Sequence, residues 1–384
     1  VAQRVRPHMI MFVFFAAANA FAYAVAIGQY MEHDFLNLRF NIAEKQYTKF
    51  ISTFGNINMY ASYLSISIPV LLAVFTFCRN WFCRILSGIL LIAAGCNILI
   101  ANSDSVFLGI FAGTVVLVIL AFMQGRLRQC TFGVFLLFVG NLVLGFINKY
   151  AHTRYDKKRG GLAIALNRLD IAFALWGLAL LIFVIVCMCR WRLGNRIETW
   201  NKGKIVLIVC GACVALGVIG MIALKVMDPS LFTFNDKWGS YRGYIWRKIV
   251  EVYGDAPFVN KLFGYGNESV RLTLKAACYN EMVQVTGKVY DNAHNELLQY
   301  LFTTGIVGLL SYLALVGSCI VYMFKHAKEH AWICVCLAAT VGYFAQSILN
   351  LNQPITTPLF FVFMAMGVGT VNYCRRVKEL EKRA

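Results

Sequence analysis

Two side chains in the second half of the sequence, His294 and Arg242, are the best suited to chemistry. His294 lies in VYDNAHNELLQYL, where Asp291 or Asn292 can cap the helix that continues into a long apolar segment. The positive end of the helix dipole disfavours an imidazolium in the first turn, so we expect a neutral His294. A neutral imidazole can accept a proton from a hydroxyl group. The alternative is an ordinary polar residue at a helix start, hydrogen-bonded to backbone or water.

Arg242 lies in GSYRGYIW, beside Gly239 and Gly243, where the backbone can approach a ligand closely. Its guanidinium group suits bidentate binding of phosphate. The alternative for Arg242 and for Arg247, in the same segment, is a place on the solvated face of an interfacial helix, and this alternative is favoured for Arg247. The sequence therefore predicts an anion-binding residue in Arg242.

Two further polar positions stand where apolar segments begin. Arg168 precedes Asp170, and their spacing fits either a mutual ion pair or binding of lipid phosphate by Arg168. Asn58, together with Asn56, can cap the segment that follows or bind a ligand, and capping is at least as well supported.

The segments that carry these residues are typical of a membrane protein. Hydrophobic residues make up 59% and charged residues 14% of the chain, whereas soluble domains have about 25% charged residues. Apolar runs of about 20 residues, long enough to cross ~30 Å of hydrocarbon, recur along the sequence. The composition predicts an all-α, polytopic transmembrane bundle that forms a single domain over residues 1–384. Ten spans are predicted, at residues 9–29, 61–77, 85–102, 106–123, 131–148, 170–189, 205–225, 297–323, 331–349 and 358–374.

Basic residues gather in the short loops on one side of these spans and in the two terminal segments. The positive-inside bias then predicts that both termini are cytoplasmic. Anionic lipid heads attract Lys and Arg on that side, which accounts for most of the net charge of +18. No nucleic-acid partner is therefore expected.

The largest segment outside the membrane runs over residues 226–296, and we expect it to be the functional loop. Long loops are usually functional or disordered, and this one is too aromatic for disorder. In YRGYIWRKIVEVYG, apolar residues recur at helical spacing until Gly254 and Pro257 end the helix. We expect this helix to lie in the membrane interface, with Trp and Tyr at headgroup level. A second short helix is predicted over residues 270–284, after a turn in FGYGNES.

Other function classes are less consistent with the sequence. Ionisable residues are scarce in the central parts of the spans, which argues against a transporter with a charged relay near the midplane. No P-loop, HExxH, GxSxG or dinucleotide-binding fingerprint is present. Chemistry must then depend on His, Arg and polar groups at the outer interface.

The motifs around the large loop resemble the O-antigen ligase and polymerase superfamily of bacterial membrane glycosyltransferases. GSYRGYIW at the front of the loop, LFGYGNES within it and DNAHNELLQYLFTTGIVGLLSYL after it carry the resemblance, with GNINMYASYL and ALNRLDIAFALW earlier in the chain. The most specific pattern, AHN followed by spaced Leu and Gly, is matched by Ala293, His294, Asn295, Leu298, Gly305 and Gly308. One departure is ANSDSVFLG, where Asp104 stands in place of the arginine of many members, so no phosphate-binding role is assigned to that turn.

The resemblance implies an inverting, metal-independent transfer of glycan from a polyprenyl-diphosphate donor, without a cofactor. Arg242 and Arg168 would bind the diphosphate, and His294 would accept the proton of the acceptor hydroxyl. Five further residues would help to bind the substrate or to maintain the structure of the site: Asn295, Asn292, Asn58, Gly264 and Gly266. The expected partners are membrane lipid, the lipid-linked donor and a glycan, lipid or polymer acceptor. The expected location is the bacterial inner membrane, with the active face extracytoplasmic. Members typically have about twelve spans, so two further spans are expected outside this sequence, which begins at Val1.

Three alternatives stay open. A ligase and a repeat-unit polymerase share this machinery, and the sequence does not separate them. A peptidoglycan-type glycosyltransferase would be expected to have a carboxylate as the outstanding residue of its outer loop. A lipid-linked oligosaccharide flippase, the non-enzymatic alternative, would be expected to carry charged residues in a central cavity.

Overall fold

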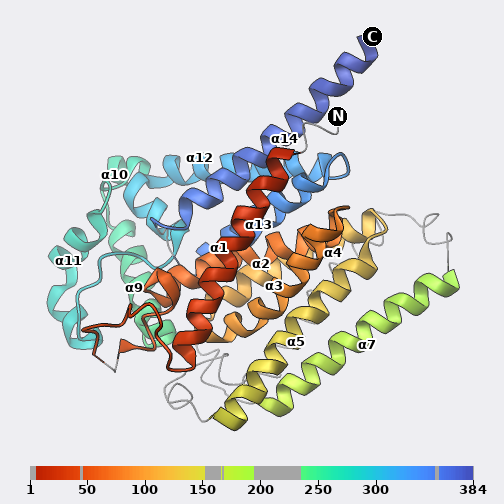
Figure 1. Ribbon diagram of the computed structural model, residues 1–384. Helices are drawn as coiled ribbons and strands as arrows, with labels where there is room; N and C mark the ends of the chain where they lie inside the picture. Colours follow the sequence, from red (N-terminus) through yellow and green to blue (C-terminus); the bar gives the residue numbers. More distant parts are fainter. Residues whose placement is uncertain are drawn as a thin grey trace. The chain divides into compact units, whose positions relative to one another are not determined.

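The computed structural model describes residues 6–43, 46–151, 166, 168–193, 235–350 and 354–383, and this part of the chain consists of helices joined by turns, with no strand (Figure 1). Eight of its helices are long and apolar enough to cross a membrane, and α13 (Ala331–Ser347) is a shorter apolar helix. The eight are α1 (Arg6–Tyr30), α2 (Ile57–Phe77), α3 (Trp81–Ile100), α4 (Ser105–Met123), α5 (Leu127–Ala151), α7 (Leu169–Leu193), α12 (Glu296–His326) and α14 (Thr357–Arg383). The polytopic helical architecture is thus confirmed, while the span predicted at residues 205–225 lies outside the described residues.

The chain forms two compact units, and each is described by itself. Unit 1 comprises Val1–Val214, Tyr322–Gln346 and Pro354–Ala384. Unit 2 comprises Ala215–Val321 and Ser347–Gln353, and so contains the large loop, residues 226–296.

Unit 1 is built around α2. Every side chain of α2 from Tyr60 to Phe77 is buried, and α3, α4 and α5 all contact this helix. Neighbouring helices therefore enclose α2 on every side, and α2 forms the centre of unit 1. Its start is capped as predicted, since the Asn56 side chain accepts a hydrogen bond of 2.8 Å from the backbone N–H of Asn58.

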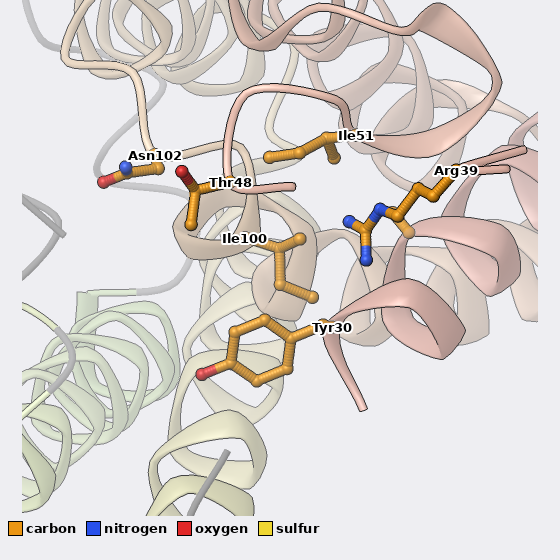
Figure 2. A pocket seen from close by; sticks show the side chains of 7 residues that line it. Tyr30, Arg39, Thr48, Ile51, Ile100 and Asn102 are labelled. Atoms are coloured by element: carbon orange, nitrogen blue, oxygen red, sulfur yellow. The ribbon is translucent and has the colours of Figure 1, made fainter. Parts of the chain in front are cut away.

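A small pocket in unit 1 lies between the end of α1, the end of α3 and the segment before α2 (Figure 2). Its one cationic side chain, Arg39, donates hydrogen bonds to the carbonyl oxygens of Gln29 at 2.9 Å, Phe50 at 3.0 Å and Tyr47 at 3.2 Å. The guanidinium therefore holds the segment after α1 in place, and this pocket is not a convincing anion site. The lining residues are Ala26, Tyr30, Arg39, Thr48, Ile51, Ile100 and Asn102.

The large loop folds into a core of its own in unit 2, as its aromatic content predicted. It contains α9 (Trp238–Gly254), α10 (Phe258–Phe263) and α11 (Ser269–Thr286). α9 and α11 match the two helices expected there, whereas the short helix α10 was not predicted. The expectation that α9 turns its apolar stripe to the membrane interface is wrong, because Ile245 and Ile249 are fully buried. Packing against α11 and the start of α12 removes that stripe from water more completely than an interface would. The core residues are Tyr244, Ile245, Ile249, Val270, Leu274, Met282, Tyr290, Ala293 and Phe302.

The predicted span at residues 297–323 is not one straight helix, because α12 folds back at Gly305. In a straight helix Glu296 and Tyr312 would lie ~24 Å apart along the axis. Instead the Tyr312 hydroxyl donates a 2.8 Å hydrogen bond to the Glu296 carboxylate, and the rings of Tyr300 and Tyr312 stack at 4.3 Å. Gly305, with φ 69° and ψ −174°, makes this bend. The portion after the bend, residues 306–326, is by itself ~31 Å long and sufficient to cross the hydrocarbon.

The turn after α10 docks on this bend through two glycines. The N–H groups of Tyr265 and Gly266 donate 3.0 Å hydrogen bonds to the carbonyls of Phe302 and Thr303. A Cβ on Gly264 would lie 2.3 Å from the Thr303 carbonyl, and one on Gly305 would lie 2.2 Å from the Leu262 carbonyl. The backbones meet directly, so neither position has room for a side chain.

Gly264→Ala should therefore destabilise unit 2 strongly, since the alanine adds a backbone clash to a positive-φ conformation that alone costs about 1–3 kcal/mol. The measurement is the midpoint of thermal aggregation of the full chain in detergent. Gly287→Ala is the matched control, because Gly287 also has a positive φ (72°) but its Cβ would meet open space. Equal midpoint shifts in the two variants would show that the contact at the bend contributes nothing.

Candidate active site

His294 precedes α12 rather than lying in its first turn. The helix begins at Glu296, and its cap is Asn295, whose side chain accepts a 3.0 Å hydrogen bond from the Leu298 N–H. The expected caps, Asp291 and Asn292, are wrong because a helical start at either would require helical backbone at His294, which has φ 48°. Asn292 instead accepts a 3.2 Å hydrogen bond from the His294 N–H and so fixes this unusual backbone conformation.

The environment of His294 favours the neutral imidazole. The pKa of His294 is lowered to about 4, chiefly by burial and further by the positive charges of Arg242 and Lys288, while the charge of Asp291 opposes the shift. The ring is therefore neutral at pH 7, as expected, but the first cause is loss of water rather than the helix dipole. Its Nδ1 atom is buried and has no hydrogen-bond partner among the residues that the structure describes.

Arg242 follows a run of three residues, Gly239, Ser240 and Tyr241, that all have positive φ. The Tyr290 hydroxyl donates a 2.7 Å hydrogen bond to the Ser240 carbonyl and so ties this run to the segment that carries His294. The nearby Gly243 serves chain packing rather than ligand approach, because a Cβ there would lie 2.0 Å from the Asn235 carbonyl.

A second hydrogen bond joins the same two segments. The Trp246 indole N–H donates to the Ala293 carbonyl at 2.9 Å, next to His294. The two contacts together place Arg242 close enough to His294 for its charge to act on the imidazole. Residues about fifty positions apart in the sequence thus form one site.

Sequence reasoning missed Tyr290 and Lys288. The Tyr290 ring is buried and meets the His294 ring edge-to-face at 6.0 Å. The Lys288 ammonium lies 4.4 Å from the centre of the Tyr290 ring, on which it makes a cation–π contact. Both residues immediately precede the histidine motif, and this proximity was the only signal in the sequence that could have suggested them.

Because α12 folds back at Gly305, the site lies beside the part of α12 that follows the bend. Glu296, two residues after His294, is 1% exposed and contacts Tyr312, which lies about two helical turns beyond the bend. The His294 end of α12 therefore lies alongside the first turns of the membrane-crossing portion.

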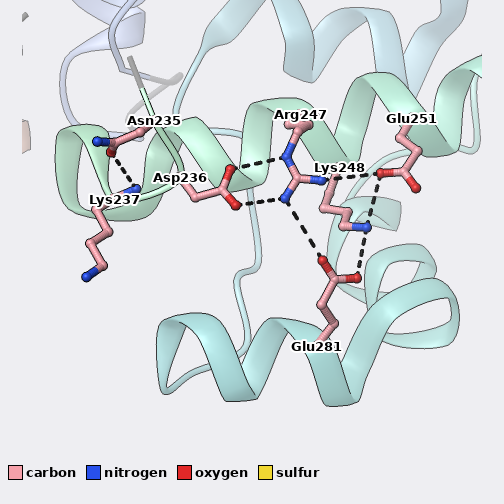
Figure 3. A network of polar contacts seen from close by, with 7 residues as sticks. All are labelled: Asn235, Asp236, Lys237, Arg247, Lys248, Glu251 and Glu281. Atoms are coloured by element: carbon pink, nitrogen blue, oxygen red, sulfur yellow. Dashed lines mark hydrogen bonds and ion pairs between the residues drawn. The ribbon is translucent and has the colours of Figure 1, made fainter. Parts of the chain in front are cut away.

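Arg247 belongs to an ion-pair network between α9 and α11, not to the site around His294 (Figure 3). Its guanidinium binds Asp236 with two hydrogen bonds, of 3.1 and 2.8 Å, and lies 4.0 Å from Glu281. Lys248 pairs with Glu281 at 2.8 Å and with Glu251 at 3.1 Å. These contacts are consistent with the prediction that Arg247 lies on the solvated face of the helix and has a structural role.

Arg168 and Asn58 belong to unit 1. Arg168 makes two hydrogen bonds with Asp170, of 3.1 and 2.7 Å, which is the ion pair that the sequence offered as an alternative to phosphate binding. Asn58 accepts a 3.4 Å hydrogen bond from the Ser103 hydroxyl, in a chain of buried polar contacts that continues through Ser105. In the described structure both residues thus have structural partners.

Fold and site together define a multi-pass helical membrane protein whose folded loop brings a neutral histidine next to two cations. Residues 159–313 match the family model described as O-Antigen ligase, a range that includes Arg168, Arg242 and His294. This match supports the assignment of the chain to the O-antigen ligase and polymerase superfamily, which the motifs resemble. A search of the curated proteins found no match.

Proposed function

We propose that this protein is a membrane glycosyltransferase that transfers glycan from a polyprenyl-diphosphate donor to an acceptor hydroxyl, with inversion and without a metal ion. The observation that carries the proposal is the neutral His294 beside Arg242 and Lys288, within the region that matches the O-antigen ligase family. A neutral imidazole and cations are the groups that such a transfer needs, as proton acceptor and as stabilisers of the leaving diphosphate.

The reaction balances with these residues alone. The acceptor hydroxyl oxygen attacks the anomeric carbon of the donor sugar on the face opposite the diphosphate. A new glycosidic bond forms while the bond from the anomeric carbon to the diphosphate oxygen breaks. The hydroxyl proton passes to His294, and polyprenyl diphosphate leaves with the electron pair of the broken bond. Arg242 stabilises the charge that develops on that leaving group, a contribution of roughly 3–4 kcal/mol for one such group.

The remaining residues support this arrangement. We assign Lys288 as an additional cation near the diphosphate, because it acts on the same imidazole as Arg242. Arg168 is assigned to the diphosphate by family resemblance, and it would have to exchange its partner Asp170 for phosphate. Asn292 and Asn295 hold the backbone on either side of His294.

Three other residues assigned by resemblance act through the fold. Gly264 and Gly266 have φ of 77° and 97° and shape the turn that docks on the bend of α12. Asn58 supports unit 1 through its polar contact with Ser103. We propose that none of these three residues acts on the reacting atoms.

The identity of the acceptor distinguishes a ligase from a polymerase. A ligase moves a finished glycan to another lipid or polymer, whereas a repeat-unit polymerase joins one lipid-linked repeat to the next. A flippase would need no proton acceptor and would leave the donor bond intact. We propose extracytoplasmic chemistry at a bacterial inner membrane, in surface-polysaccharide assembly, on the strength of the loop charges and the family match.

The test is transfer by the purified full chain in vesicles that contain undecaprenyl-diphosphate-linked glycan. Release of undecaprenyl diphosphate together with a new glycosidic bond is expected, in the presence of a chelator as in its absence. Extension of the lipid-linked glycan itself would identify a polymerase, and product only on an added acceptor would identify a ligase. The proposal would be contradicted if the donor crossed the bilayer with its diphosphate bond intact while both the lipid-linked glycan and the added acceptor were present.

The pH dependence of transfer should reflect the depressed pKa of His294. Because the base must be neutral, kcat/KM is expected to stay level from pH 7 to about 5 and to fall only as the pH approaches about 4. Lys288→Met removes a positive charge that disfavours the imidazolium, so the acidic limb should move to higher pH. The shift should be partial, since burial remains. A wild-type limb near 6.5, the ordinary pKa of histidine, would contradict the role of His294.

A further inference from the structure

The short helix α10 carries an exposed apolar surface. Phe258, Val259 and Phe263 are 74%, 65% and 62% exposed, although large apolar side chains are among the residues most often buried. Lys261, the basic residue of its last turn, lies between them in the sequence. We name these four residues the α10 patch.

The docking of α10 fixes the level of the α10 patch relative to the membrane. The carbonyl of Leu262 and the backbone of Phe263 lie against Gly305, at the bend of α12. Residues 306–326 beyond the bend have just the length, ~31 Å, needed to cross the hydrocarbon. The bend, and α10 with it, therefore lies at one boundary of the bilayer.

Further exposed apolar residues follow the bend that the α10 patch adjoins. The first turns after the bend expose Ile306, Val307 and Leu310, as a helix in contact with acyl chains would. An exposed apolar patch next to a membrane-crossing helix is stabilised by the same acyl chains, and a lysine beside it suits lipid phosphate.

We propose that α10 is an interfacial anchor that inserts Phe258, Val259 and Phe263 into the adjacent leaflet, with Lys261 at the phosphate level. The anchor holds unit 2 on the bilayer surface at the bend of α12. This inference depends on the contacts of α10 and not on the proposed glycosyl transfer. The occupant is bilayer lipid, and a second copy of the chain or another protein is the alternative.

Photo-crosslinking of the full chain in vesicles of phosphatidylethanolamine and phosphatidylglycerol tests the anchor. Phe258 is replaced by p-benzoylphenylalanine, which keeps an aromatic group at an exposed position, and Phe263 is replaced in a second variant. Lipid adducts, identified by mass spectrometry, are expected at both positions.

Two control positions give the high and low reference yields of lipid adducts. Phe14, an exposed residue of the membrane-crossing α1, should give lipid adducts, and Gln284, an exposed polar residue of α11, should give few. Adducts at Phe258 and Phe263 comparable with those at Phe14 and severalfold above those at Gln284 would support the anchor. Covalent dimers, adducts to another protein, or lipid yields no higher than at Gln284 would overturn it.

Discussion

Replacement of His294 by alanine is expected to lower kcat for glycan transfer by about 10²–10⁴-fold while leaving donor binding largely intact. The imidazole is neutral, half-buried and held by Asn292 in a left-handed backbone conformation, so the fold presents its lone pair at neutral pH. Alanine removes the proton acceptor without adding bulk. The measurement is the initial rate of undecaprenyl diphosphate release at saturating donor and acceptor.

Two comparisons separate a catalytic loss from a folding defect. His33→Ala changes an exposed histidine in the segment after α1 and should leave the rate near that of the wild type. Added imidazole should restore part of the rate of His294→Ala, because a small base can enter the space left by the ring, and it should not affect His33→Ala. A His294→Ala variant that elutes normally in gel filtration and keeps the wild-type rate would remove His294 from the mechanism.

Replacement of Arg242 by alanine is expected to lower kcat/KM by about 10²–10³-fold, because one stabilising group for a developing oxyanion contributes roughly 3–4 kcal/mol. Unlike the loss at His294, this loss should include weaker donor binding, since the diphosphate is charged before and after the bond breaks. Arg242→Lys should recover only part of the rate, because an ammonium lacks the planar fork of the guanidinium. Transfer rates at several donor concentrations separate the effect on kcat from that on KM.

The matched control for Arg242 is Arg271→Ala on α11. Arg271 is exposed and belongs to the same unit, so its loss changes the net charge equally without removing a group from the site. Wild-type kinetics are expected for this variant. Equal losses for the two variants would indicate a general effect of charge on lipid-substrate recruitment, and the specific role of Arg242 would then be wrong.

Local patterns in the sequence were enough to predict most of the helices. The spans follow from apolar runs that must satisfy their backbone hydrogen bonds within lipid, and α9 and α11 follow from apolar residues at helical spacing. The histidine motif was visible because the chain has only six histidines, and the arginine before α9's apolar stripe was visible from its position among glycines. The family match over residues 159–313 agrees with what those motifs indicated.

The prediction from the sequence was wrong where the apolar pattern continues although the helix changes direction. Apolar residues continue past Gly305, so the sequence predicts α12 as one straight span. The backbone of Gly305 and the contact between Glu296 and Tyr312 reveal the bend. The stripe of α9 has the periodicity of an interfacial helix and of a core helix alike. Its partner surface, formed by α11 and Tyr290, decided between them.

The sequence by itself determined that this is a multi-pass helical protein with a folded loop that carries a histidine and an arginine, because composition and periodicity are local properties of the chain. Only the tertiary structure decided that Arg242, Lys288 and His294 share one site. It did so through the hydrogen bonds from Tyr290 to Ser240 and from Trp246 to Ala293. It also decided why His294 is neutral, since burial depends on what packs around the ring and not on its neighbours in the sequence.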